Sequence, residues 1–266
     1  QWGGSNEIGG SPRGGKTGLS LGEIMFITRW VYQPPSAGRR LTAIALGAAA
    51  ATAAILIAAI SGGSSLALES VPGLMVRGGL SGAAISAVVL AVFGIGLTYL
   101  GHSRHPGRFG LRRPDSFAFL AALPLTVLLA VVGGAWVAVA PGISINLVGT
   151  AIVLTAIVGI EALLRGALHG HLLRVFPVMM GSGRIFVSIP NLVSALVFAC
   201  AVTACLLPPG WLTETIRGWW AVWFGAALIL GLICGAVREW WRSLWAAVIL
   251  HAASAIVAWI VLSYWL

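Results

Sequence analysis

Seven stretches of about twenty mostly apolar residues recur along this chain of 266 residues, and each is long enough to cross a bilayer as a helix. The bilayer interior offers no water to the backbone, and a helix satisfies its own polar groups. We therefore expect an all-α, polytopic transmembrane helical bundle of about seven spans. Their expected ranges are 41–61, 80–101, 117–140, 144 to beyond Arg165, 187–207, 218–236 and 243–265.

The composition agrees with a membrane protein. Hydrophobic residues make up 59% of the chain, charged residues 9%, and the mean hydropathy is +0.97, values too apolar for a soluble domain. The net charge of +9 would suit nucleic acid, but the arginines are scattered through short loops. We expect a lipid bilayer as the surroundings and no nucleic acid. Cys200, Cys205 and Cys234 lie within apolar runs and are predicted to be small packing residues.

Basic residues in the loops predict the orientation, because cytoplasmic loops carry an excess of lysine and arginine. One set of alternate loops holds only Arg77 and Arg217. We expect the N terminus and the Arg165 end of the fourth span to face the cytoplasm. The predicted cytoplasmic residues are Arg13, Lys16, Arg29, Arg39, Arg40, Arg104, Arg108, Arg112, Arg113, Arg174, Arg184, Arg238 and Arg242.

The first forty residues differ from the rest of the chain. Residues 1–18 are polar and glycine-rich, which predicts no signal peptide and a tail that is disordered by itself. Residues 19–32 are too few to span and are predicted to form an interfacial helix. We divide the chain into this segment, 1–40, and a transmembrane domain, 41–266. We expect either that domain or a partner chain to hold the tail.

Glu161 and Arg165 stand one helical turn apart in the fourth span, so they can pair where water is scarce. Ionisable residues inside a membrane are functional by default. A mutually neutralising pair also ties helices together, so both a catalytic and a structural interpretation of the pair stay open. We expect no other charge at this depth. His251 lies in an apolar run. Four roles are open for it: a ligand, a proton carrier, a hydrogen-bonding partner of Glu161 or a structural histidine. His169 and His171 are expected near water, and a metal site built from them alone would lack further ligands.

Two segments resemble the CAAX-protease and bacteriocin-processing intramembrane proteases (CPBP, also called Abi). Residues 161–166 read EALLRG, similar to the second half of the family motif EExxxRG, and residues 243–251 look like the approach to its HxxxN motif. Residues 109–114, FGLRRP, more weakly resemble a loop sequence that is common before the core of the family. The resemblance covers roughly residues 80–266, which we take as the CPBP-like core.

The resemblance implies a reaction in which the first Glu of EExxxR activates water, helped by the His of FxxxH and by the His and Asn of HxxxN. The corresponding positions here hold Ile160, Val202, His251 and Ala255. No histidine occurs between positions 171 and 251, so the loss does not depend on the alignment. Isoleucine cannot serve as a general base.

Three hypotheses follow. The first is a catalytically inactive CPBP-like protein of a bacterial inner membrane, without a cofactor, that binds or scaffolds other membrane protein subunits, with its tail as one contact. The second is an active CAAX-type endopeptidase using Glu161, His251 and either His169 or His171, which requires Glu161 and His251 to lie within about 7 Å. The third is a cofactor- or pigment-binding subunit in which His251 ligates a metal centre.

Overall fold

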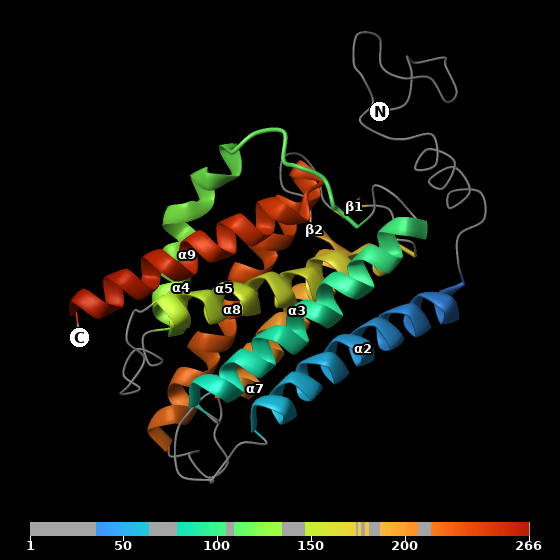
Figure 1. The fold of residues 1–266 in the computed structure, drawn as a ribbon. Helices are drawn as coiled ribbons and strands as arrows, with labels where there is room; N and C mark the ends of the chain where they lie inside the picture. Colours follow the sequence, from blue (N-terminus) through green and yellow to red (C-terminus); the bar gives the residue numbers. More distant parts are fainter. Residues whose placement is uncertain are drawn as a thin grey trace.

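The computed structural model describes residues 36–63, 79–104, 109–134, 147–173, 175–176, 179–180, 187–206 and 214–265. Almost all of these residues are helical, and the helices pack side by side into one bundle (Figure 1). The predicted all-α bundle is confirmed. The tail and the interfacial helix predicted at 19–32 lie outside the described residues.

Within the described ranges, seven helical segments match the seven predicted spans in order. The sixth continues to Trp241 instead of ending at 236. The segments are α2 (Ala37–Gly63), α3 (Gly79–Arg104), the short helix η1 (Ala118–Ala122) with α4 (Leu123–Gly134), α5 (Leu147–Glu161) with the π-helix η2 (Ala162–Leu168) and α6 (His169–Leu172), α7 (Ile189–Leu206), α8 (Glu214–Trp241) and α9 (Leu244–Trp265).

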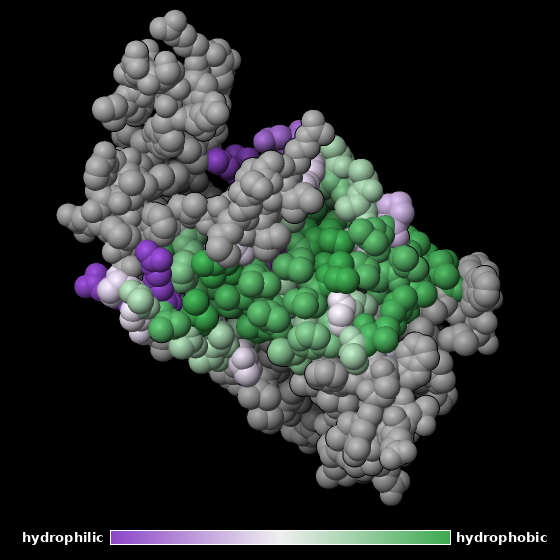
Figure 2. Space-filling model, turned by 180° about the vertical axis from the view of Figure 1, so that it is seen from behind, coloured by the Kyte–Doolittle hydropathy of each residue, from purple (hydrophilic) through white to green (hydrophobic). Residues whose placement is uncertain are grey.

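The described helices have the character of membrane spans. Four are long and apolar enough to cross a bilayer, and two more are apolar but shorter. Figure 2 shows a broad band of hydrophobic residues on one face of the molecule. This apolar surface identifies an integral membrane protein. The four long stretches are Ala84–Ser103, Val148–Leu172, Ala221–Trp241 and Leu244–Val261, and the shorter ones are Ala118–Val132 and Ile189–Ala201.

Small residues allow α3 and α5 to approach closely. A Cβ atom at Gly94 would lie 2.8 Å from the backbone nitrogen of Leu163, and a Cβ atom at Gly159 would overlap the backbone of α3. Just beyond this contact, Thr98 Oγ1 donates a hydrogen bond of 2.6 Å to the carbonyl of Ala162. Close backbone approach at glycine is a common way to join helices in lipid. It fixes the end of α5 against α3.

The loop that precedes η1 is fastened to the junction between α8 and α9. Gly110 has a φ of +70°, in the left-handed region that favours glycine, and its carbonyl accepts a 2.7 Å hydrogen bond from the Leu244 nitrogen. Ser243 Oγ donates to the Arg112 carbonyl at 2.5 Å, and Arg112 Nη2 donates to the Trp241 carbonyl at 3.2 Å. Two loops that the arginine pattern assigns to the same side therefore do lie at the same end of the bundle.

A short hairpin precedes α7 and was not predicted. Strands β1 (Met179–Met180) and β2 (Val187–Ser188) pair antiparallel, with Met179 opposite Ser188. The Ser188 hydroxyl then accepts a 3.0 Å hydrogen bond from the Asn191 backbone nitrogen, which caps the first turn of α7. The hairpin thus delivers a polar side chain to the buried end of a helix.

Candidate functional site

Glu161 and Arg165 lie inside the bundle where α5 passes into the π-helix η2. Both residues are buried. Arg165 Nε lies 3.6 Å from Glu161 Oε2, and Arg165 Nη2 donates a 2.8 Å hydrogen bond to the carbonyl of Gly231 on α8. A π-helix has a wider turn than an α-helix and often occurs at functional sites. The predicted pair is present, and it joins η2 to α8.

His251 reaches the same carboxylate from α9. Its Nδ1 lies 2.8 Å from Glu161 Oε1, and its side chain keeps 12% of its surface exposed, against 1% for Glu161. The Phe198 ring of α7 contacts both partners of Glu161, with its centroid 5.6 Å from the imidazole centroid and 5.0 Å from Arg165 Cζ. Glu161, Arg165 and His251 therefore form one group, which we call the central cluster. All three residues are candidate site residues predicted from the sequence.

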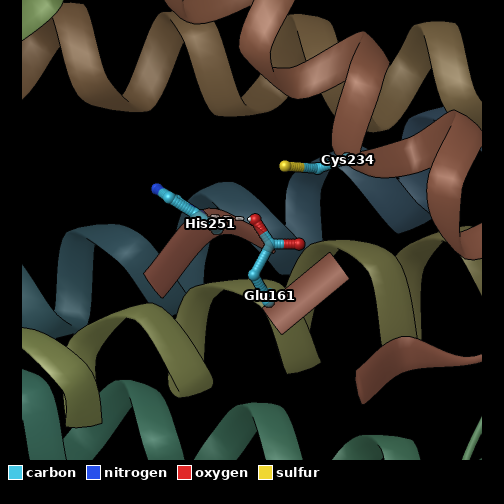
Figure 3. A group of neighbouring side chains, drawn as sticks. All are labelled: Glu161, Cys234 and His251. Carbon is cyan, nitrogen blue, oxygen red and sulfur yellow. Dashed lines mark hydrogen bonds and ion pairs between the residues drawn. The ribbon is translucent and has the colours of Figure 1, made fainter. Parts of the chain in front are cut away.

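Small residues of α8 face the central cluster. A Cβ atom at Gly231 would lie 2.9 Å from Arg165 Nη2, so glycine leaves room for the guanidinium group. Cys234, one turn further on, is buried, and its sulfur lies with a carboxylate oxygen of Glu161 and a ring nitrogen of His251, all within 4.8 Å of one another. Figure 3 shows the three side chains converging from α5, α8 and α9. Thiolate, carboxylate and imidazole are common ligands of metal ions.

The positions where the resemblance expects catalytic groups are apolar. Ile160 is partly buried and packs against the hydrophobic core around Leu163 and Leu164. Ala255 is half-buried on α9, one turn after His251. Val202 belongs to α7, but its side chain lies outside the described part of the chain. The base beside Glu161 and the Asn after His251 are therefore replaced by side chains that can neither exchange a proton nor donate a hydrogen bond.

A second buried polar group, which we call the junction cluster, lies towards the α8–α9 junction. His169 Nε2 is 3.0 Å from Glu239 Oε1, and both side chains are almost completely buried. The Ser188 hydroxyl donates a hydrogen bond to the same oxygen of Glu239. Nearby, Asn191 Nδ2 donates to the carbonyl of Leu232 at 3.1 Å. The junction cluster joins α6, α8 and the start of α7.

Two sequence expectations are wrong at the junction cluster. His169 is fully buried instead of lying near water, because the chain continues inside the bundle through η2 and α6. Glu161 and Arg165 are also not the only deep charges, since Arg238 and Glu239 are only 3% and 7% exposed. His171 is half-buried. Adjacent opposite charges at the end of an apolar span were the signal that could have indicated this cluster.

Comparison with known proteins agrees with the resemblance found in the sequence. Residues 142–257 match the family described as type II CAAX prenyl endopeptidase Rce1-like. The matched range begins later than the 80–266 expected, and it contains both buried clusters. No curated protein and no solved structure shows a significant match to the chain.

Proposed function

Because residues 142–257 match the Rce1-like family of type II CAAX prenyl endopeptidases, we propose that this integral membrane protein uses the family fold without its reaction. It is a catalytically inactive subunit of a larger membrane complex, and its function is to bind and scaffold the other membrane protein subunits. The N-terminal segment, residues 1–40, is one contact for the partner subunits. The protein resides in a bacterial inner membrane with its N terminus in the cytoplasm.

The state of the Glu161 carboxylate carries the proposal. One oxygen lies 2.8 Å from His251 Nδ1 and the other lies 3.6 Å from Arg165 Nε, so both oxygens face a partner. The carboxylate is also fully buried. A general base must reach the water that it deprotonates. A carboxylate enclosed in this way serves better to hold α5, α8 and α9 together than to activate water.

The apolar replacements reinforce this interpretation. General acid–base catalysis contributes roughly 10²–10⁴-fold to a rate, and one oxyanion donor contributes about 10²–10³-fold. Ile160 and Ala255 can supply neither contribution. A chain that lacks both the general base and the oxyanion donor would retain little of the family's peptidase activity. The buried contacts of Glu161 that hold the helices together are nevertheless present.

Mild extraction of the tagged full-length protein from its native membrane tests the scaffolding role. We expect it to elute in an assembly of defined mass with stoichiometric partner subunits, which are retained through a second purification step. Removal of residues 1–35 is expected to weaken that assembly without changing the helix content. Recovery of the untruncated protein alone and monodisperse would contradict the proposal.

One observation favours a second candidate function, an intramembrane endopeptidase with atypical residues. The 2.8 Å contact between Glu161 and His251 is well inside the limit of about 7 Å that this hypothesis requires. If Nδ1 donates to the carboxylate, Nε2 is left as an acceptor and can take a proton from water. His251 is also the most exposed member of the central cluster. Hydrolysis that requires both Glu161 and His251 would favour this candidate.

A further inference from the structure

Three side chains with different metal-binding chemistry converge beside the central cluster. Glu161 ends α5, Cys234 lies about two turns before the end of α8, and His251 lies in the second turn of α9. One possible ligand atom from each lies within 4.8 Å of the others. The three residues are distant in sequence, so this convergence is produced by the fold and not by a local motif. A cysteine serving only to fill space would not require the other two groups beside it.

From this geometry we propose that Glu161, Cys234 and His251 form a binding site for a divalent transition-metal ion of the zinc type. The inference concerns binding alone and goes beyond the scaffolding role, which can hold or fail independently. A tetrahedral zinc ion with bonds of about 2.0–2.3 Å places its ligands roughly 3.3–3.6 Å apart. The 2.8 Å contact between Glu161 and His251 would lengthen slightly and the longer separations would shorten, changes that side-chain rotations can provide.

The surroundings suit such an ion. Glu161 and Cys234 are almost fully buried, and a thiolate with a carboxylate balances the charge of a divalent cation in an apolar interior. Arg165 faces the second oxygen of Glu161 and would act as an outer partner that fixes the carboxylate. A thiolate together with an imidazole favours zinc, cobalt or copper over magnesium and calcium.

Three protein ligands leave one position of a tetrahedral ion open. With Arg165 included, the occupied site would carry one net positive charge. A hydroxide or another anion in the open position would balance that charge. Of the three ligands, only His251 retains appreciable exposure, and it would provide the side from which the ion and its fourth ligand enter.

Cobalt binding tests the site, because a cobalt–thiolate bond has a charge-transfer absorption band. The full chain has three cysteines, so a Cys200→Ser/Cys205→Ser protein retains Cys234 as its only thiol. This protein is purified in detergent, stripped with a chelator and titrated with Co²⁺. We expect one equivalent to bind and the thiolate band to appear. Addition of Cys234→Ser should remove the band and weaken Co²⁺ binding by more than about 100-fold, since even loss of an outer partner costs about 10–100-fold.

A thermal measurement guards against variants that simply fail to fold. Zn²⁺ should raise the melting temperature of the wild type and of the Cys200→Ser/Cys205→Ser protein, and it should leave the variant with Cys234→Ser unchanged. Absence of the band in the protein that retains Cys234 would overturn the proposal. An equal band, or an equal rise in melting temperature, in the variant that lacks Cys234 would overturn it as well.

Discussion

The central cluster and the junction cluster are both buried groups of ionisable side chains, yet they differ in access and in chemical variety. The junction cluster pairs His169 with Glu239, and neither side chain has appreciable exposure. In the central cluster Glu161 contacts both an arginine and a histidine that is 12% exposed, with a thiol close by. Deep burial of charge therefore does not by itself distinguish a ligand site from a helix brace. Partial access to solvent and a mixed set of ligand groups distinguish a ligand site from a helix brace.

Removal of the Glu161 carboxylate should have the largest effect on stability. Glu161→Ala leaves the fully buried Arg165 without its anionic partner, which typically costs about 3–5 kcal/mol. We expect a large fall in the unfolding free energy, measured by denaturant titration in detergent. Glu161→Gln keeps the side-chain volume but also removes the charge, so it should be destabilised nearly as much. An unchanged midpoint in both variants would show that the pair does not brace the bundle.

The same change in the junction cluster should cost less and leave metal binding intact. Glu239→Ala removes the acceptor of the Ser188 hydrogen bond and the partner of His169, a loss of about 1–3 kcal/mol. Arg238 also loses a neighbouring carboxylate, but it lies three residues from the end of α8 and is 3% exposed, so it is less completely enclosed than Arg165. Denaturant titration measures the loss, and the Co²⁺ band should persist. Asp115→Asn, at an exposed ion pair, is the control and should not change the midpoint measurably.

Crowding the central cluster should have the smallest effect. Gly231→Ala places a methyl group 2.9 Å from Arg165 Nη2 and 3.1 Å from the Ala195 Cα, and the overpacking is expected to cost about 1 kcal/mol. Gly225→Ala on the same helix meets nothing within 4 Å and should cause no loss. Differential thermal unfolding of the two variants measures the difference. Equal melting temperatures would mean that α8 moves freely away from Arg165.

The sequence predicts the central cluster better than the junction cluster, and the reason is physical. Glu161 and Arg165 are spaced for one helix face, and His251 is an unusual residue in an apolar run, so each is visible locally. Cys234 is apolar enough to appear as packing, and its place beside Glu161 depends on the rotation of α8. Such rotations are set by tertiary packing, which no periodicity in one helix reveals.

The junction cluster depends on features that are invisible in the hydropathy pattern. A π-helix, which no residue spacing predicts, comes directly before His169. The chain is therefore still inside the bundle when it reaches His169. A hairpin of two-residue strands brings Ser188 to Glu239, although the two residues are far apart in sequence. The seven helical segments were predictable because each follows from its length and apolarity. The division into 1–40 and 41–266 stays a prediction.

The central claim is that the enclosed Glu161 carboxylate holds helices together and does not activate water for peptide hydrolysis. The direct test is a single-turnover assay of the purified wild-type protein in liposomes, with excess protein over a prenylated CAAX peptide and products quantified by mass spectrometry. Glu161→Ala and His251→Ala proteins are run in parallel. We predict that the wild type releases no more product than either variant. Product release by the wild type that is abolished in both folded variants would contradict the account and establish the peptidase.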